Sequence, residues 1–240
     1  MLEKLKQAVL DANLALVRNG LVVLTWGNAS AIDRASGLVA IKPSGVSYAE
    51  MKAEDIVLVE LGSGRVAEGR LRPSSDTPTH LVLYRAWGGV GGIVHTHSTH
   101  ATVWAQTRSD IPCFGTTHAD TFKGAVPCVP PLTQKQIEAD YEGNTGLAIV
   151  GTFAKRGLDP AHTPAALCAC HGPLAWGRDA AEAVEHAVIL EEVAKMAVLT
   201  RVIAPTASEA PRHLQDKHFQ RKHGSTAYYG QKNTDLGLRP

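Results

Sequence analysis

Apolar residues recur along the chain with two periods, one typical of helices and one typical of strands. The N-terminal segment has the helical period. We expect this helix to end at Gly20, and its apolar stripe consists of Leu2, Leu5, Val9, Ala12 and Leu16. Short apolar runs then predict strands at 21–25, 38–41 and 56–60, separated by turn-forming segments.

The rest of the chain alternates between the two patterns. Ser75 or Asp76 is expected to cap one helix, and Asp179 with Glu182 predicts a capping box for a long one. The expected elements are a helix over 77–87, a strand at 91–97, a helix over 98–106, a loop-rich stretch at 107–133, a helix over 144–156 that ends at Gly157, strands at 166–170 and 174–176, and a helix from 180 to about Thr200.

Strands and helices are therefore mixed from end to end, with several turns directly between strands. This order predicts an α/β fold, a single domain with a mixed, largely antiparallel central β-sheet flanked by helices. The domain is expected to cover residues 1–231. Residues 232–240, KNTDLGLRP, are polar and lack periodicity, so we expect a disordered C-terminal tail.

The composition excludes several classes of protein. The 240 residues are 44% hydrophobic and carry a formal net charge of +1 at pH 7, without a long run of either sign. We therefore expect no nucleic-acid partner and no membrane partner. Charges interrupt the N-terminal apolar residues, unlike in a signal peptide, and no apolar stretch reaches the roughly 18 residues that span a bilayer. Four cysteines are too few for a disulfide scaffold, so we expect a cytoplasmic protein.

The segment His95-Thr96-His97 is the most informative one for chemistry. In a strand its two histidines point to the same face with Cα atoms roughly 6.5–7 Å apart, so both imidazoles can reach one ion. His171 follows an apolar run, and Asp76 stands at a predicted helix start. Three imidazoles and a carboxylate suit Zn²⁺, with Mn²⁺ or Co²⁺ as workable substitutes.

Two competing metal patterns fit less well. The histidines from His95 to His100 have the spacing of half a metallo-hydrolase motif, but Thr99 stands where that motif needs Asp. His100 is expected on the following helix, facing away from the site. Cys168 and Cys170 could bind metal as thiolates, yet free cysteines are commonly small buried hydrophobes. We therefore expect both cysteines to be buried in the core.

Two segments suit the binding of a phosphate group. KPSG at 42–45 follows a predicted strand, and the serines at 74–75 precede a predicted helix. Hydroxyls, a lysine and backbone N–H groups at a helix start can together hold a phosphate dianion, although each segment alone is an ordinary turn. The glycines at 88–92 precede a strand rather than join a strand to a helix. They therefore predict a turn and not a dinucleotide-binding loop.

A series of segments resembles the class II aldolase/adducin family. They cover about residues 1–231, nearly the whole chain. The segments are LTWGN at 24–28, IKPSG at 41–45, PSSDTPTH at 73–80, GIVHTHS at 92–98, GTTHAD at 115–120, HGP at 171–173, LEEVA at 190–194, DKH at 216–218 with RKHG at 221–224, and AYYG at 227–230.

The resemblance implies roles for residues of this chain. The implied metal ligands are Asp76, His95, His97 and His171. The implied phosphate-binding residues are Asn28, Lys42, Ser44, Gly45, Ser74 and Ser75. Asp120 and Tyr229 would be an acid/base pair that reaches in from a neighbouring subunit, at an interface lined by Thr116, Glu142, His218 and Arg221. Since the family's usual assembly is a fourfold ring, the resemblance implies a homotetramer.

Asp76 favours one branch of the family, the sugar-phosphate 4-epimerases, because the related aldolases typically have Glu at this position. The implied reaction interconverts L-ribulose 5-phosphate and D-xylulose 5-phosphate, so the implied ligand is a phosphorylated ketopentose. The alternatives are aldol cleavage of fuculose or rhamnulose phosphate and a non-catalytic scaffold of the same fold. Ala169-Cys170 is less polar than the resemblance leads us to expect, and Tyr228 is an alternative to Tyr229 as the phenol.

The implied chemistry agrees with the residues present. The acidic hydrogen of a 2-ketose lies on C3, so simple enolisation cannot epimerise C4, and the sequence has no motif of a nicotinamide site for a redox route. The remaining route breaks the C3–C4 bond, rotates the aldehyde and re-forms the bond on its other face. A metal can stabilise the enediolate, and an acid/base pair can move the proton of the C4 hydroxyl.

Overall fold

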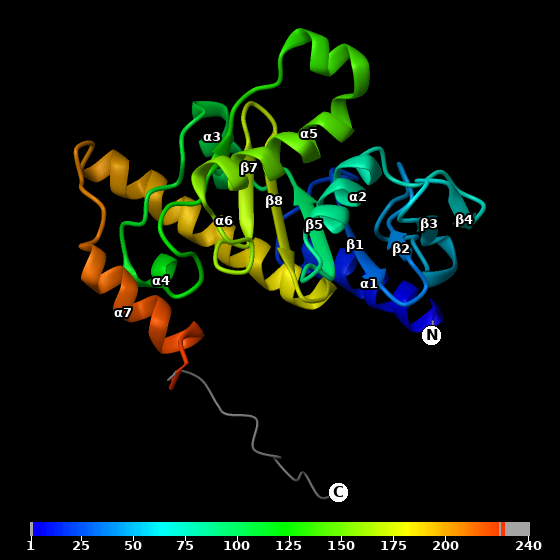
Figure 1. The fold of residues 1–240 in the computed structure, drawn as a ribbon, viewed down its shortest axis with the longest axis horizontal. Helices are drawn as coiled ribbons and strands as arrows, with labels where there is room; N and C mark the ends of the chain where they lie inside the picture. Colours follow the sequence, from blue (N-terminus) through cyan, green and yellow to red (C-terminus); the bar gives the residue numbers. More distant parts are fainter. Residues whose placement is uncertain (1, 226, 229–240) are drawn as a thin grey trace, which may run out of the picture.

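The computed structural model describes residues 2–225 and 227–228, in which one eight-stranded mixed sheet forms the centre (Figure 1). The strand order is β4-β3-β2-β1-β5-β8-β7-β6, and neighbouring strands are antiparallel except for the parallel pair β6 and β7. The strands are β1 Gly27–Asp33, β2 Leu38–Ile41, β3 Val57–Glu60, β4 Val66–Glu68, β5 Gly92–Thr96, β6 Cys128–Val129, β7 Ala165–Cys168 and β8 Gly172–Gly177.

Helices cover both faces of this sheet. α1, α3 and α6 pack against one face, while α2 and α5 contact each other on the opposite face (Figure 1). The short α4 contacts α7. The helices are α1 Leu2–Arg18, α2 Thr77–Ala86, α3 Thr99–Thr107, α4 Thr116–Ala119, α5 Gln134–Arg156, α6 Ala180–Ile203 and α7 Arg212–His223, with a 3₁₀ turn, η1, at Ala53–Asp55. None of these described helices has the length and apolarity needed to cross a bilayer.

Strand side chains alternate between the two helical layers, as the period of two requires. In β3, Leu58 packs in the layer of α1, whereas Val57 and Val59 pack in the layer of α2 and α5. Every residue of β5 and β8 is buried. Burial on both faces fixes the register of these two central strands, and it therefore also fixes how their ends meet.

The predicted fold class is confirmed, and the ends of several helices follow the predicted signals. α1 ends just before Gly20, which has a φ of 66°, and α5 ends before Gly157, which has a φ of 61°. The Asp179 side chain caps α6 by accepting a hydrogen bond from the Glu182 backbone N–H at 2.8 Å. The predicted capping box is only half formed, because the Glu182 carboxylate accepts from the backbone N–H of Arg178 instead.

The strand predicted at 21–25 is wrong, because the chain forms a loop there in which Val23 and Leu24 are exposed. Leu24 has a left-handed φ of 54° and a relative exposure of 74%. The chain becomes a strand only at Gly27, where β1 begins. Leu24 and its neighbours thus form a loop that leads into the sheet at the position of Asn28.

The helix predicted at 144–156 begins earlier, at Gln134. Thr133 forms a capping box with Gln136, a polar signal that outweighs the weak apolar periodicity of this segment. The backbone of Asp140 is not helical, with φ −167° and ψ 91°, so α5 consists of two helical parts joined by a kink.

Cys168 is buried as predicted, but the same prediction is wrong for Cys170. Cys170 has a left-handed φ of 63° in the tight turn between β7 and β8, and it is exposed because the chain has left the strand at this point. The cysteines are all free.

Candidate metal and substrate site

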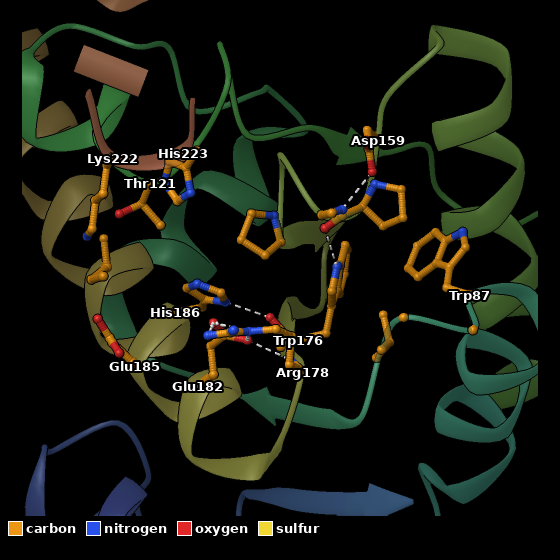
Figure 2. A pocket seen from close by; sticks show the side chains of 18 residues that line it. Trp87, Thr121, Asp159, Trp176, Arg178, Glu182, Glu185, His186, Lys222 and His223 are labelled. Carbon is orange, nitrogen blue, oxygen red and sulfur yellow. Dashed lines mark hydrogen bonds and ion pairs between the residues drawn. The ribbon is translucent and has the colours of Figure 1, made fainter. Parts of the chain in front are cut away.

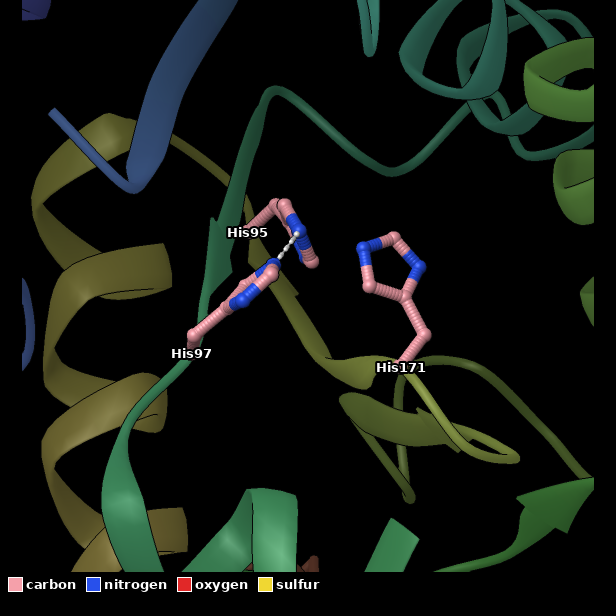
Figure 3. A group of neighbouring side chains, drawn as sticks. All are labelled: His95, His97 and His171. Carbon is pink, nitrogen blue, oxygen red and sulfur yellow. Dashed lines mark hydrogen bonds between the residues drawn. The ribbon is translucent and has the colours of Figure 1, made fainter. Parts of the chain in front are cut away.

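Three histidines converge where β5 ends and β8 begins (Figure 3). His95 lies in β5, His97 follows the end of that strand, and His171 lies in the turn before β8. β5 and β8 are antiparallel neighbours, with His95 opposite Leu174, so the turn that holds His171 folds back over the other two rings. One potential ligand atom from each of the three side chains lies within 4.8 Å of the others.

Gly172 lets this turn approach β5 closely. A Cβ atom built on Gly172 would lie 2.7 Å from the carbonyl oxygen of Thr96 and 3.6 Å from Cε1 of His95. The first distance is too short for a carbon–oxygen contact, and the atom it meets belongs to the backbone and cannot swing aside. Glycine at this position is therefore a steric requirement of the histidine cluster.

The arrangement of the three imidazoles fits a metal ion with nitrogen ligands. Nε2 of His95 and Nε2 of His97 lie 3.1 Å apart, close to the ~3.3 Å expected between two ligands of a tetrahedral zinc ion with bonds of about 2.0–2.1 Å. His95 Nδ1 hydrogen-bonds to the carbonyl oxygen of Pro173 at 2.9 Å. Since a carbonyl only accepts, Nδ1 carries the proton and Nε2 keeps its lone pair.

Burial favours the neutral form of His97 and His171, the form in which histidine binds a metal. Burial, together with the neighbouring His95 and His97, lowers the pKa of His171 to about 4. Burial and His95 also lower the pKa of His97 below its ordinary value. At neutral pH, His97 and His171 therefore offer lone pairs rather than positive charges.

Asp76 lies beside the three histidines at the N-cap position, directly before the first residue of α2. Its side chain makes no capping hydrogen bond to the helix, and its Oδ2 accepts a hydrogen bond from Nδ2 of Asn28 at 2.6 Å. Burial raises the pKa of Asp76, but His95, His80 and the Asn28 hydrogen bond outweigh it and hold the pKa below its usual value. Asp76 is thus a carboxylate facing the cluster, and its role as fourth ligand stays a prediction.

The histidines open into a cavity of about 420 Å³, and the predicted phosphate-binding residues lie around it. It is lined by Thr25, Trp26, Gly27, Asn28, Lys42, Pro43, Ser44, Gly45, Ser74, Ser75, Asp76, His95, His97, Tyr141, Glu142 and His171. The structure thus brings together residues from six regions of the sequence that the pattern alone could only treat separately.

Lys42 and Asn28 are the polar groups best placed to hold a ligand in this cavity. Lys42 Nζ donates to the carbonyl oxygens of Pro43 and Val46, which leaves one of its three N–H groups for a ligand. Burial lowers the pKa of Lys42. The side-chain oxygen of Asn28 is buried and has no hydrogen-bond partner among the described atoms. Such an acceptor is costly to leave unpaired, and a hydroxyl of a bound ligand would satisfy it.

Asp120 belongs to a different cluster, formed where α4 and α7 meet. Its carboxylate accepts from Arg221 at 2.8 and 3.0 Å and hydrogen-bonds to His218 Nδ1 at 3.1 Å. Thr116 begins α4, one turn before Asp120. Of the residues predicted to line the interface, only Glu142 lies in the histidine cavity, so one chain alone does not unite the predicted set.

The two candidate phenols, Tyr228 and Tyr229, are neighbours in the sequence. Tyr229 lies outside the described residues. Tyr228 follows α7, where its side chain is 61% exposed and its ring lies 5.2 Å from Nζ of Lys217.

A larger cavity, of about 710 Å³, lies at the other end of β5 and β8 (Figure 2). None of the predicted site residues in the described part of the chain lines it. Two of its polar groups are paired within the chain: Arg178 forms an ion pair with Glu182, and His186 Nδ1 hydrogen-bonds to the carbonyl oxygen of Trp176 at 2.6 Å. Its size therefore does not make it the candidate site.

Tyr141 is a cavity residue that the sequence did not single out. Its hydroxyl lies 3.2 Å from Nδ1 of His171, and it lines the same cavity as Asp76 and Glu142. Its position depends on the kink at Asp140 in α5. The sequence pattern does not indicate this kink.

The fold and this site agree with a known family. The chain matches the class II aldolase and adducin N-terminal domain over residues 7–198. Because that match covers most of the chain, the protein belongs to the class II aldolase and adducin family. This confirms the resemblance expected from the sequence motifs.

Within this family the chain is similar to the L-ribulose-5-phosphate 4-epimerase UlaF of Salmonella paratyphi B. The two are 54% identical over 231 residues, which is 96% of this chain and 100% of that protein. The protein of the same name from Salmonella paratyphi A has the same identity and coverage. Among solved structures, an L-fuculose 1-phosphate aldolase matches with a TM-score of 0.77 and 28% identity, covering 91% of this chain and 95% of that one.

Proposed function

We propose that this protein is a metal-dependent L-ribulose-5-phosphate 4-epimerase, which interconverts L-ribulose 5-phosphate and D-xylulose 5-phosphate. The observation that carries the proposal is a single cavity in which His95, His97 and His171 face the segments at 42–45 and 74–75. A metal-binding group and a phosphate-binding group within one cavity are what this reaction needs. The identity of 54% to epimerases over their whole length supports the same assignment.

His95, His97, His171 and Asp76 would hold the ion, for which Zn²⁺ fits best and Mn²⁺ or Co²⁺ are substitutes. When bound, the ion supplies a Lewis acid for the oxygens of the enediolate that C3–C4 cleavage produces. The chain's own residues retain and orient the substrate. The phosphate would be held by Lys42, by the Ser44, Ser74 and Ser75 hydroxyls, and by backbone N–H groups near Gly45 and the start of α2.

Asp120 and Tyr229 would move the proton of the C4 hydroxyl, one on each face of the aldehyde. Within one chain, none of the described cavities is lined by both Asp120 and the three histidines. We infer that Asp120, Thr116, His218 and Arg221 act on the cavity of a second copy. A homotetramer with its active sites between subunits is the assembly proposed.

The free cysteines fit a reducing compartment, and we propose that the enzyme acts in the cytoplasm.

Epimerisation without release of the two-carbon fragment needs a cavity that keeps the aldehyde bound. The phosphate-binding segments serve this purpose, because the aldehyde fragment carries the phosphate.

The test is to incubate the zinc-loaded protein with L-ribulose 5-phosphate and to measure D-xylulose 5-phosphate. We expect its formation to stop with a chelator and to return with Zn²⁺. Bound metal without any reaction would contradict the substrate. Absence of metal binding would contradict the metal centre itself.

The solved L-fuculose 1-phosphate aldolase favours a second candidate, aldol cleavage with release of products. The test separates the two reactions, since an aldolase would release glycolaldehyde phosphate from L-ribulose 5-phosphate without forming the epimer. Asp76, in place of the Glu typical of the aldolases, is the residue that favours the epimerase.

A further inference from the structure

The three histidines of the cluster are not held equally well by the backbone. His95 lies within a buried strand and is itself 3% exposed. His171 lies in the turn after Cys170, whose φ of 63° marks the point where the chain leaves β7. A ring on such a turn can rotate about its side-chain bonds unless a neighbouring group holds it.

Tyr141 is the described side chain whose hydrogen bond holds the His171 ring. Its hydroxyl lies 3.2 Å from His171 Nδ1, and it comes from α5, an element remote in the sequence from the β7–β8 turn. Figure 3 shows one nitrogen of His171 facing the other two histidines, while the nitrogen next to the substituted ring carbon points away from them. The nitrogen that points away is Nδ1, the one that Tyr141 contacts.

The local structure of α5 fixes the position of Tyr141. The preceding residue, Asp140, breaks the helix, and its Oδ1 accepts a hydrogen bond from the backbone N–H of Gly143 at 3.0 Å. The carbonyl oxygen of Tyr141 accepts from the Thr145 hydroxyl at 2.8 Å. Tyr141 thus starts the second helical part of α5 at a defined point, and the kink directs its side chain to the cavity.

The hydrogen bond to Nδ1 decides which nitrogen of His171 is available to a metal. In a neutral imidazole one nitrogen carries the proton and the other carries the lone pair. A proton on Nδ1 that is donated to the Tyr141 oxygen leaves the lone pair on Nε2, directed at the cluster. His95 has the same arrangement, with the carbonyl oxygen of Pro173 in the place of the tyrosine hydroxyl.

We propose that Tyr141 is a positioning residue of the metal centre, which fixes the rotamer and the tautomer of His171. The inference rests on the proposed function in one respect, namely that the three histidines hold a metal ion. It goes beyond that function by giving Tyr141 a role that acts through His171 and not through the substrate.

The variant Tyr141→Phe tests this role, because it removes one oxygen and keeps the ring. The side chain is 37% exposed, so the fold should tolerate the change. We expect the dissociation constant for Zn²⁺, measured by competition with a chromophoric chelator, to rise about 10–100-fold. We also expect the visible spectrum of the Co²⁺-loaded variant to shift, since a displaced imidazole changes the ligand field.

Tyr84→Phe is the matched control. It removes a tyrosine hydroxyl that hydrogen-bonds to Ser30 at 2.8 Å, so it repeats the chemical change outside the three-histidine cluster. Its zinc affinity and Co²⁺ spectrum should equal those of the unchanged protein. An equal loss of affinity in both variants would mean that general destabilisation causes the effect, and it would overturn the proposal.

The tautomer of His171 gives a second measurement that needs no metal and no activity. In ¹⁵N-labelled metal-free protein, long-range ¹H–¹⁵N correlations should show the proton on Nδ1 of His171, and Tyr141→Phe should shift it toward a mixture of tautomers. An unchanged tautomer together with unchanged zinc affinity would overturn the proposal. If the unchanged protein bound no metal while the tautomer shifted as expected, the metal centre would fail and the positioning of His171 by Tyr141 would stand.

Discussion

Asn28 connects the two halves of the candidate site through a single amide group. Its Nδ2 donates to Asp76 at 2.6 Å and lies 3.1 Å from Oγ of Ser74, while its oxygen remains unpaired among the described atoms. The same side chain therefore orients a carboxylate beside the histidines and a hydroxyl of the phosphate-binding segment. Its position in β1 is fixed by pairing with His95 in β5.

Asn28→Ala should raise the KM for L-ribulose 5-phosphate about tenfold or more, because hydrogen bonds to charged groups contribute about 1.5–3 kcal/mol. The zinc affinity should fall as well, since Asp76 loses its partner. Steady-state kinetics and chelator competition measure the two effects. Asn19→Ala, an exposed asparagine that bonds only to the carbonyl of Ala15 among its described contacts, is the control and should change neither.

Because of Asp120, the free energy of unfolding should depend on pH in the acidic range. Burial raises its pKa, but the hydrogen bonds and charges of Arg221 and His218 outweigh this and hold the pKa below the usual value. A depressed pKa means that the carboxylate stabilises the folded state above the unfolded pKa of about 3.9, and that this stabilisation is lost as the pH falls through the lower folded value.

Asp120→Asn should therefore lower the melting temperature at pH 7, and the difference from the unchanged protein should shrink below about pH 4. Thermal unfolding across this range measures it. Asp216→Asn is the control, because it breaks the exposed pair with Arg212 and should change the melting temperature little at any pH. A difference for Asp120→Asn that stays constant in acid would contradict the stated role of its charge.

Among the helices, α6 illustrates how a local signal supports a whole layer of the core. The Asp179 side chain accepts a hydrogen bond from a backbone N–H group at the start of α6. The buried residues of α6 contact β5 and β8 on the face opposite α2. The start of α6 lies next to the first residue of β5, since a Cβ on Gly92 would meet the backbone of Asp179. Loss of the cap would thus weaken the packing where β5 begins and β8 ends.

Asp179→Ala should reduce the free energy of unfolding by about 1 kcal/mol, the usual effect of losing a helix N-cap. For a chain of this length that corresponds to a fall in melting temperature of about 2–4 °C. Glu185→Ala, at an exposed position of the same helix, is the control and should leave the melting temperature unchanged. Equal changes in the two variants would show that the cap is not the cause.

At this scale the sequence predicts elements well where burial and capping agree. α1, β2, β3, α2, β5 and α6 all follow an apolar pattern with a clear end signal. The segment at 21–25 has the apolar pattern of a strand, but it forms a partly exposed loop that leads to Gly27. β1 and α7 were not predicted, because GNASAID is only weakly apolar and α7 is strongly polar.

The candidate site divides in the same way. Two histidines two residues apart on a predicted strand are visible in the sequence, and so is a third directly after another predicted strand. The approach of Tyr141 to His171 depends on a kink in α5, and the separation of Asp120 from the histidines depends on how α4 and α7 pack. Neither can be obtained from local patterns, since both are consequences of tertiary packing.

Within one chain, the residues proposed for the reaction lie in two separate places. The metal and phosphate groups lie at one end of β5 and β8, whereas Asp120 lies between α4 and α7. If both groups act on one substrate, each active site must combine two copies of the chain. Cyclic assemblies produce such sites, because each subunit offers a different surface to each neighbour.

Two inactive variants should therefore restore activity when their subunits are mixed. His97→Ala removes a proposed ligand and Asp120→Asn removes a proposed acid, so each assembly alone should be inactive. Random mixing in equal amounts should give active combinations at about one quarter of the sites of a cyclic assembly. Turnover after subunit exchange measures this. Mixed assemblies that stay inactive would contradict the shared site, and an active Asp120→Asn assembly would contradict the role of Asp120.

The contact at Gly172 limits how this site can change during evolution. The atom nearest to a Cβ added at Gly172 is the backbone oxygen of Thr96, so even a single methyl group at this position would separate the turn from β5. Gly88, by comparison, has no heavy atom near the position of an added Cβ. In a library of random variants selected for growth on a sugar that requires the enzyme, substitutions at Gly88 should survive and those at Gly172 should disappear. Substitutions in the surrounding loops can therefore change the substrate during evolution, whereas a single substitution of Gly172 would disrupt the point where the two strands meet.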